Sequence, residues 1–351
     1  MRFRPRLLAW ALLLLSVTRL PAQAGELEIY FIDVMGGAAT LVVTPERESI
    51  LIDSGWPGLG DRDPKRIVHV LKDVLKLDHI DHLVTTHWHM DHFGGVEGLS
   101  RLTRIDHFWD RGLPNLAAAD QDKALFPDGP KADDALGIAY LKASKGKRTT
   151  LKAGDRLPLK GKVNALVLAA SGAVIEGSDF PVNPLCANAP ADLPPDPSDN
   201  AQSITLRFRL GAFDFLDCGD LTWRAEKRLV CPLDRIGPID LYQVTHHGMD
   251  ISNHPTLLQT VRPKVAIMNN GPRKGGSAET VARLRGIDSI EAAYQLHKNE
   301  ETAASENVEA SRIANADSAG GKYIKVSVSE DGSKFGVQIN GEGEVRTFKV
   351  D

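Results

Sequence analysis

Short apolar runs, broken by glycine, asparagine and aspartate, recur along the chain after residue 25 and predict β-strands. The first group of runs covers 28–34, 40–43, 50–52 and 82–86. The second group covers 204–210, 213–217, 239–244 and 265–268. Apolar and polar residues alternate strictly over 204–210, which is the pattern of a strand with one buried face.

Two segments between or after these strands have helical features. Apolar residues recur with helical spacing at Ile67, Val70, Leu71, Val74 and Leu75. Asp63 is the expected N-cap of this helix, with Pro64 at its first position. A second helix is expected between the cap residue Ser277 and Gly286. Strands alternating with helices predict a layered α/β protein, whose strand ends carry the active-site residues.

The remaining segments are expected to be parts of one domain that spans 25–351. Residues 111–150 show no clear strand, and 176–200 contain six prolines, so both are expected to be insertions. The alternation that begins at Tyr323 and turns at Asp331-Gly332 predicts a C-terminal β-hairpin.

The first 24 residues have the pattern of a cleaved signal peptide. Three arginines precede an apolar run at 7–15, and Ala22-Gln23-Ala24 places small residues before a cleavage site after Ala24. The apolar run is too short to span a bilayer core of about 30 Å. We therefore expect a periplasmic or secreted protein that keeps no membrane anchor.

Composition and charge narrow the function classes. The 351 residues include 42 % hydrophobic side chains and carry a net charge of -4, which excludes an extensively disordered chain. Residues 1–24 hold four arginines and no acidic residue, so their removal changes the net charge to -8. A net negative charge of this size disfavours a nucleic-acid partner and favours a small-molecule substrate.

The three cysteines allow one disulfide in an exported chain. Cys186 and Cys231 are a candidate pair, which would leave Cys218 as a buried thiol. The sequence does not fix this pairing.

A cluster of metal-binding side chains follows the strand predicted at 82–86. His87 and His89 are two residues apart, so they leave an extended chain on one face and can bind one cation. Asp91 and His92 lie just beyond, where the chain turns, and can bind a second cation. Imidazole and carboxylate ligands suit zinc, with manganese or iron as alternatives.

Further candidate ligands follow later strands. Asp220 comes after 213–217, where its two carboxylate oxygens could bridge two metal ions. His246 and His247 come after 239–244. Because side chains alternate along a strand, we expect one of these histidines to bind metal and the other to reach substrate. Alternation does not decide which.

Together these motifs resemble the metallo-β-lactamase superfamily. The matching segments are Leu51-Ile52-Asp53-Ser54-Gly55, His87-x-His89-x-Asp91-His92, Cys218-Gly219-Asp220 and Thr245-His246-His247-Gly248. The resemblance covers about residues 25–275 and implies a four-layer αββα sandwich with two metal ions. It also implies a structural role for Asp53. Asn200-x-x-Ser203 points to the branch of competence (DNA-uptake) hydrolase domains and phosphorylcholine esterases, and similarity to the esterases favours His247 as the ligand.

The chain departs from the superfamily in one respect. Many members supply a further histidine ligand before the bridging aspartate, but no histidine occurs here between His107 and His246. The first metal site is therefore expected to consist of His87, His89 and Asp220, completed by solvent or Asn200, with Cys186 as a weaker alternative. The second site is expected to consist of Asp91, His92, Asp220 and His247.

The resemblance implies a metal-dependent hydrolase that uses a hydroxide bridging the two metals. Asp91 and His246 are the expected catalytic residues, and His246 would stabilise developing charge or protonate the leaving group. A phosphodiester or another small anionic ester is the leading substrate, contacted by Asn269, Asn270, Arg273 and Lys274. The alternatives are a lactone or β-lactam hydrolase, a nuclease, a redox diiron enzyme and a non-catalytic metal-binding envelope protein.

Overall fold

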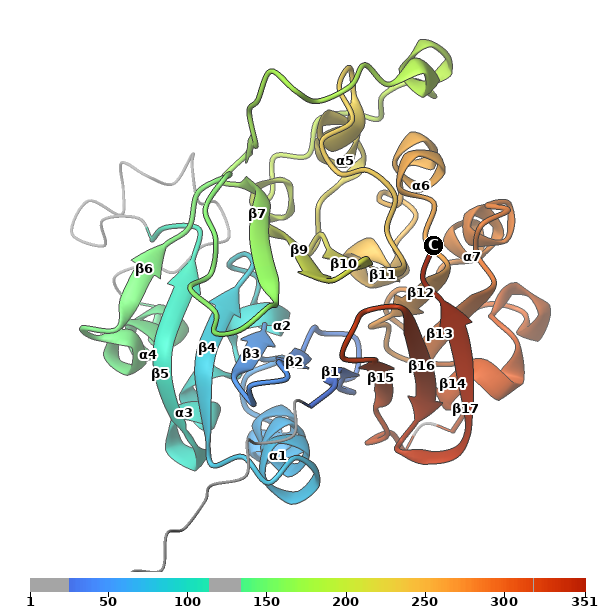
Figure 1. Cartoon of the computed structure of the whole chain (residues 1–351). Coiled ribbons are helices and arrows are strands. Elements are labelled where there is room, and N and C mark those ends of the chain that lie inside the picture. The colour runs from blue at the N-terminus through green and yellow to red at the C-terminus, as the bar shows by residue number, and fades with distance from the viewer. Residues whose placement is uncertain (1–24, 114–133, 318) are drawn as a thin grey trace, which may run out of the picture.

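The computed structural model describes residues 25–113, 134–317 and 319–351. The expected signal peptide, at 1–24, and residues 114–133 of the first insertion lie outside the described residues. Two β-sheets form the centre of the molecule (Figure 1).

The first sheet is built from both ends of the chain. Its order is β17-β16-β15-β1-β2-β3-β4-β5-β6. The N-terminal strands are β1 (Leu27–Phe31), β2 (Thr40–Val43), β3 (Ser49–Ile52), β4 (His79–Thr85), β5 (Arg104–Asp110) and β6 (Arg148–Thr150). The C-terminal strands are β15 (Ile324–Val328), β16 (Lys334–Ile339) and β17 (Glu342–Lys349). The antiparallel pair β15–β16 confirms the predicted hairpin, which β17 extends.

The second sheet contains the middle of the chain, in the order β14-β13-β12-β11-β10-β9-β7-β8. Its strands are β7 (Asn164–Ala170), β8 (Ala173–Val174), β9 (Thr205–Leu210), β10 (Phe213–Asp217), β11 (Leu241–Gln243), β12 (Val265–Met268), β13 (Ala292–His297) and β14 (Ile313–Asn315). Strands β10, β11, β12 and β13 run parallel to one another, so the loops at their carboxyl ends open at one edge of the sheet.

Hydrophobic side chains fill three layers. The two sheets pack face to face, as in the edge-to-face contact of Phe31 with Phe215, whose ring centroids are 5.9 Å apart. The outer face of the first sheet is covered by α1 (Arg62–Val68), α3 (Val96–Leu102) and α4 (Ala135–Ser144). The outer face of the second is covered by α5 (Trp223–Val230), α6 (Pro255–Val261) and α7 (Ala278–Arg285). This arrangement is the expected αββα sandwich (Figure 1).

The predicted helices are present, with one correction at a cap. Ser277 Oγ accepts a hydrogen bond from Thr280 N at the start of α7, and the helix ends before Gly286, as expected. Helix α1 continues as a π-helical turn over His69–Val74, but Asp63 does not cap it. The Asp63 carboxylate lies inside the first turn, where it accepts a hydrogen bond from the backbone N–H of Trp56 at 2.9 Å.

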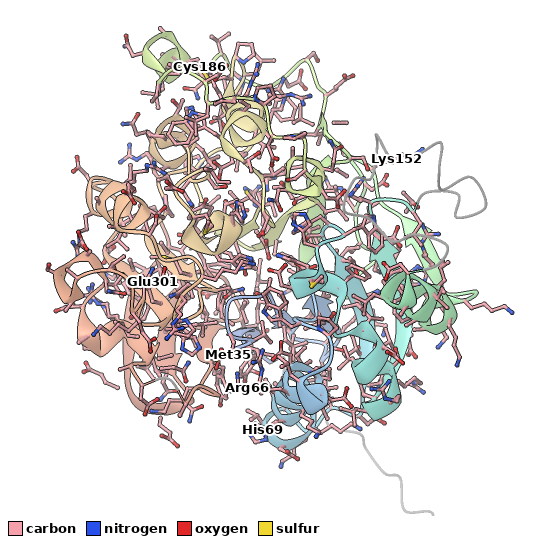
Figure 2. The ribbon with its side chains drawn as sticks, turned by 180° about the vertical axis from the view of Figure 1, so that it is seen from behind. Met35, Arg66, His69, Lys152, Cys186 and Glu301 are labelled. Carbon is pink, nitrogen blue, oxygen red and sulfur yellow. A yellow bond between two sulfur atoms is a disulfide. The ribbon has the colours of Figure 1, made fainter. Side chains whose placement is uncertain are left out.

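A disulfide ties the proline-rich loop to the second sheet's helices. Cys186 and Cys231 are bonded, with their Cα atoms 5.7 Å apart, and Cys218 is a buried free thiol. Cys186 lies in the short 3-10 helix Pro184–Asn188, while Cys231 directly follows α5. Figure 2 shows Cys186 at the upper end of the molecule and His69, after α1, at the lower end. The pairing that the sequence left open is thus resolved.

Among residues 25–113, 134–317 and 319–351, no helix is both long and apolar enough to cross a membrane.

Candidate metal centre

The first cluster of polar residues lies where β4 ends. His87 follows this strand by two residues, and the helical turn α2 (Met90–Phe93) begins directly after His89. His87 Nε2 lies 3.1 Å from His89 Nδ1, so the two rings meet, as the spacing predicted. Asp91 and His92 are buried within α2.

Asp53, at the end of β3, holds this loop in place. Its Oδ1 accepts a hydrogen bond from Thr86 N at 2.8 Å. Its Oδ2 accepts from Thr86 Oγ1 at 2.7 Å and lies 2.7 Å from His92 Nδ1. All three residues are at most 1 % exposed, so these bonds form in a low-dielectric interior. The geometry agrees with the structural role that the resemblance implied for Asp53.

The pair His246-His247 does not follow strand alternation. Strand β11 ends at Gln243, and both histidines lie in a 3-10 turn over Thr245–Gly248 with left-handed backbone φ angles of 56° and 54°. Because they are not in a strand, the argument that only one side chain can face the site is wrong. His246 Nε2 lies 3.6 Å and His247 Nε2 lies 3.2 Å from the same oxygen, Asp220 Oδ2.

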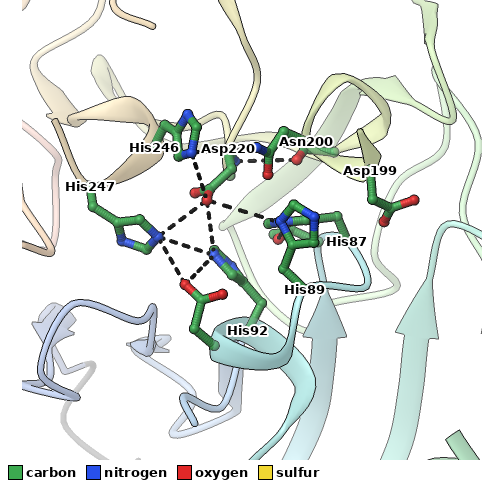
Figure 3. A network of polar contacts seen from close by, with 12 residues as sticks. His87, His89, His92, Asp199, Asn200, Asp220, His246 and His247 are labelled. Carbon is green, nitrogen blue, oxygen red and sulfur yellow. Dashed lines mark hydrogen bonds and ion pairs between the residues drawn. The ribbon is translucent and has the colours of Figure 1, made fainter. Parts of the chain in front are cut away.

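Asp220 is the centre of the site. Four imidazoles direct Nε2 at its Oδ2, two from the segment after β4 and two from the turn after β11, as Figure 3 shows. The distances are 3.9 Å for His87, 3.1 Å for His92, 3.6 Å for His246 and 3.2 Å for His247. Every one of these side chains is buried.

The other ring nitrogen of each histidine is bound to an oxygen atom. The Nδ1 partners are Thr86 Oγ1 at 3.1 Å for His87, Asp53 Oδ2 at 2.7 Å for His92, Ser252 Oγ at 3.0 Å for His246 and the Asn269 carbonyl at 3.0 Å for His247. An oxygen partner on Nδ1 favours the tautomer that carries its proton there. In that tautomer the lone pair of Nε2 faces Asp220 and is ready to bind a cation.

The protonation states of Asp220, Asp91 and His92 favour binding of a cation. Burial disfavours ionisation of Asp220, but the facing imidazoles, His247 and His92 foremost, hold the pKa of its carboxyl well below the usual range. Burial likewise opposes ionisation of Asp91, but His92 and His247 hold its pKa well below normal. Burial also opposes protonation of His92, yet Asp220, Asp91 and Asp53 raise the pKa of its imidazole well above normal. A divalent cation would take the place of that proton between two ionised carboxylates.

The other two imidazoles of this group are neutral at pH 7. Burial lowers the pKa of His87 well below its ordinary value, with the neighbouring His92 adding to the effect. Burial also lowers the pKa of His246 to about 4. A neutral imidazole is the form that binds metal.

The structure brings together one of the two ligand sets expected from the sequence. Ligand atoms of Asp91, His92, Asp220 and His247 lie within 4.8 Å of one another. Two imidazoles with two carboxylates form the donor set that zinc, manganese and iron accept. This is the second of the two sites expected from the sequence. The residues expected at the first, His87 and His89, lie on the opposite side of Asp220 from His247 in Figure 3.

Asn200, the residue expected to complete the first site or to shape it, lies beside His246. Its Nδ2 is 3.4 Å from His246 Nε2, and its Oδ1 is buried without a hydrogen-bond partner among the described residues. An orphaned buried oxygen next to histidine side chains fits a cation site. Cys186, the weaker alternative, is excluded as a ligand because its sulfur is in the disulfide.

Asp199 is a supporting residue that the sequence analysis missed. Its Oδ2 accepts a hydrogen bond from the backbone N–H of Trp88 at 2.6 Å, between His87 and His89. Arg111, at the end of β5, donates to the same carboxylate. Asp199 thereby joins the loop that carries Asn200 to the histidine loop. The adjacent Asp-Asn pair was the available sequence signal.

The four expected substrate contacts divide into two kinds. Asn269 and Asn270 are buried, and their amide groups donate to Thr40 Oγ1 at 3.2 Å and to the His297 carbonyl at 2.7 Å. These asparagines support the loop after β12, which corrects the expectation that both face substrate. Arg273 is mostly exposed and lies 3.5 Å from Glu300.

Lys274 is the cation nearest the site in this loop. Its Nζ forms an ion pair with Asp91 Oδ2 and lies 5.2 Å from the centre of the Trp56 ring. The Lys274 side chain is 34 % exposed, so its ammonium group is accessible to solvent while it contacts the buried Asp91 carboxylate. An anion entering the site would meet this charge.

One family model matches part of the chain. Residues 32–129 match the family model described as the metallo-beta-lactamase superfamily. No curated protein matches the chain.

The solved structures that match the chain have TM-scores below 0.5 and low sequence identity. CmlA, a diiron beta-hydroxylase from Streptomyces venezuelae, has a TM-score of 0.43 and 14 % identity; the match covers 78 % of this chain but 53 % of CmlA, about half its length. A putative metal-dependent hydrolase from Parabacteroides distasonis has a TM-score of 0.42 and 12 % identity over 75 % of this chain and 91 % of its own. The Rm3 metallo-beta-lactamase has a TM-score of 0.36 and 14 % identity, over 76 % and 84 %.

Proposed function

We propose that the chain, whose residues 32–129 match the family model of the metallo-beta-lactamase superfamily, is a metal-dependent hydrolase of small anionic esters, phosphodiesters foremost. The observation that carries this proposal is the convergence of four buried imidazole Nε2 atoms on Asp220 Oδ2, with the Asp91 carboxylate beside them. Without a metal ion, the two buried carboxylates are compensated by a proton on His92 and by the Lys274 ammonium group. A bound divalent cation would replace that proton as the compensating charge.

The ligands fall into two groups around Asp220. Asp91, His92 and His247 would hold one ion together with Asp220, and His87 and His89 would hold the other. When bound, the two ions would lower the pKa of water from 15.7 to about 7 and would act as Lewis acids on the scissile group. Zinc is the ion we propose, with manganese and iron as the alternatives that the same ligands accept.

The residues around the ligands would orient them and the substrate. Asp53 and Asp199 fix the histidine loop from two sides, which keeps the imidazoles at their positions during turnover. Lys274 would bind the negative charge of the substrate at the rim. Asp91 would serve both as ligand and as the partner that places the Lys274 ammonium group.

We propose that the protein acts outside the cytoplasm, in the periplasm or after secretion, on a small molecule. The Cys186–Cys231 disulfide supports this location, since such bonds persist in oxidising compartments. The net charge of -4 for the whole chain supports a small substrate over nucleic acid.

The test is metal removal followed by reconstitution. The purified protein is depleted with a chelator and assayed before and after addition of zinc, manganese or iron. The substrates are bis-p-nitrophenyl phosphate, p-nitrophenyl phosphorylcholine, p-nitrophenyl phosphate, a neutral p-nitrophenyl ester, a lactone and a β-lactam. We expect diester hydrolysis to disappear on depletion and to return with zinc. Equal activity of the depleted protein would overturn the proposal.

The same experiment separates the alternatives. Hydrolysis of only the lactone or the β-lactam would mean that the substrate is a carbonyl compound and not a phosphodiester. Two iron ions per chain without hydrolysis of any ester would favour redox chemistry. A chain that binds metal but turns over none of these substrates would favour a binding protein. Asp220→Asn removes one carboxylate oxygen from the centre and serves as the inactive reference.

A further inference from the structure

We propose that His79, Asp81 and Asp106 form a separate zinc site, at the opposite end of β4 from the metal centre. Ligand atoms of these three residues lie within 4.8 Å of one another. His79 and Asp81 belong to the start of β4, and Asp106 belongs to β5. The length of β4, about 20 Å at 3.3 Å per residue, separates this group from the histidines that follow the strand. The site is therefore independent of the metal centre and of the proposed function.

The distances around His79 fit metal coordination better than hydrogen bonding. Its Nε2 lies 3.4 Å from Asp81 Oδ1 and 3.6 Å from Asp106 Oδ2. Both distances exceed the range of about 2.7–3.2 Å that is usual for a hydrogen bond from nitrogen to oxygen. Two ligand atoms that each lie about 2.0–2.1 Å from a tetrahedral zinc ion are about 3.3–3.4 Å apart. A zinc ion between Nε2 and the two oxygens thus needs only a small inward shift of Asp106.

Each of the three ligands is held by a partner on the side away from the proposed ion. The contacts are His79 Nδ1 with Asp78 Oδ1 at 2.5 Å, Asp81 Oδ2 with Ser49 N at 2.9 Å, and Asp106 Oδ1 with Arg104 Nε at 2.9 Å. In every case the other ring nitrogen or carboxylate oxygen of the ligand is the atom that faces the ion. Such outer partners fix the orientation of metal ligands.

The pairing of β4 with β5 brings two negative charges together. Because Ile80 pairs with Ile105, the residues that follow them, Asp81 and Asp106, stand opposite each other on neighbouring strands. Two carboxylates at this position repel each other, and Arg104 compensates only one of them. A divalent cation between the two carboxylates would remove the repulsion and join the starts of the two strands.

The composition and exposure of the group favour zinc. The side chains of His79, Asp81 and Asp106 are 26 %, 20 % and 43 % exposed, so an ion can enter from solvent and keep a water ligand. An imidazole ligand suits zinc, whereas calcium takes oxygen ligands. The hydrogen bond with Asp78 and the nearby charge of Asp81 raise the pKa of the His79 imidazole. Zinc therefore competes with a proton for Nε2 and binds more tightly as the pH rises.

Zinc stoichiometry tests the ligand role. Binding is measured at about pH 8 by competition with a chromophoric chelator for wild type, His79→Gln, Asp106→Asn and the control His69→Gln. His69 is also exposed and lies 2.9 Å from Asp73, but it belongs to no group of three possible ligands among the described residues. We expect the two site variants to bind one zinc ion fewer than wild type at the same free zinc concentration. The control should bind as many ions as wild type.

A measurement on wild type locates the ion without relying on a variant that folds. The ¹⁵N chemical shifts of the imidazole nitrogens are recorded with and without excess zinc. We expect Nε2 of His79 to shift on zinc addition while Nδ1 keeps its proton, and calcium at the same concentration to leave both signals unchanged. In Asp78→Asn, which removes the carboxylate behind the ring, zinc should bind this site 10- to 100-fold more weakly.

Three results would overturn the proposal. The first is equal zinc stoichiometry and affinity in wild type, His79→Gln and Asp106→Asn. The second is a His79 ring whose ¹⁵N shifts do not change in wild type with excess zinc. The third is an equal loss of zinc in His79→Gln and His69→Gln, because that would mean that exposed histidines bind zinc without a defined site.

Discussion

Asp53 lies directly behind His92, with its Oδ2 2.7 Å from the Nδ1 of the imidazole, while the Nε2 of the same ring points at Asp220 from 3.1 Å. A buried carboxylate in this position fixes both the orientation and the tautomer of a ligand. Because Asp53 also accepts two hydrogen bonds from Thr86, the end of β4 and the ligands that follow it share one support.

The first prediction concerns this support. Asp53→Asn replaces an acceptor of three hydrogen bonds by an amide whose NH₂ group faces donors. We expect zinc affinity to fall 10- to 100-fold and the free energy of unfolding to fall by about 1–3 kcal/mol. Chelator competition and urea denaturation measure the two effects.

Asp214→Asn is the matched control, because the buried Asp214 carboxylate, near the start of β10, accepts two hydrogen bonds from Arg209. It should lose stability without losing zinc. Wild-type zinc affinity in Asp53→Asn would show that the carboxylate does not orient His92.

The second prediction concerns Lys274, which forms an ion pair with Asp91 and lies over the Trp56 ring. Lys274→Gln removes the positive charge at the rim. We expect KM for an anionic diester to rise about tenfold, which is the effect of losing roughly 1.4 kcal/mol of charge attraction at a partly exposed site. Steady-state kinetics with the diester and a neutral ester measure it, and KM for the neutral ester should stay the same.

Lys160→Gln is the control for a lost surface lysine, since Lys160 is 71 % exposed and lies 3.7 Å from Glu48. Equal changes in KM for the charged and the neutral substrate would show that Lys274 does not recognise charge.

The sequence predicted the strands whose hydrophobic pattern is strongest. Strands β2 and β12 have the predicted bounds, because all four side chains of each are apolar or buried. Strand β17 was missed because it is an edge strand, with Phe348 as its only buried residue among exposed charged side chains. A single buried position gives no periodicity.

The site was predicted where its residues form local motifs and missed where it depends on long-range contacts. His87 to His92 are read directly from six consecutive residues. Asp199 contacts Trp88 across 111 positions, a contact that one sequence does not reveal. The orientation of His246 and His247 depends on two consecutive left-handed residues, a conformation that non-glycine residues adopt at a cost of about 1–2 kcal/mol each.

The third prediction concerns the Cys186–Cys231 disulfide. The two cysteines are separated by 45 positions, and closing a loop of that length in the unfolded chain stabilises the protein by about 4 kcal/mol in the chain-entropy description. We expect the double variant Cys186→Ser/Cys231→Ser to lose about 2–5 kcal/mol in urea denaturation. A reductant should lower the wild-type midpoint toward that of the variant and leave the variant unchanged. Identical midpoints for wild type and variant without reductant would contradict the prediction.

The fourth prediction concerns Glu226, a fully buried carboxyl group on α5. Burial raises its pKa to about 7, although the backbone N–H of His254, 2.8 Å from Oε2, opposes the rise. In the folded protein this group keeps its proton up to about pH 7, whereas in the unfolded chain it loses it near the ordinary value of 4.5. The folded state therefore binds more protons between these two values, and the free energy of unfolding falls as the pH rises through them.

Glu226→Gln removes this contribution, because the amide stays neutral at every pH. The fall in stability from this group between about pH 4.5 and 7 is on the order of 3 kcal/mol. We expect the stability of Glu226→Gln relative to wild type to increase by about that amount when urea denaturation is moved from pH 5 to pH 8. Glu97→Gln, at an exposed carboxylate paired with Arg101, should show a constant difference from wild type. A constant difference for Glu226→Gln as well would mean that Glu226 is ionised in the folded protein at pH 5, and hence that burial does not control its proton.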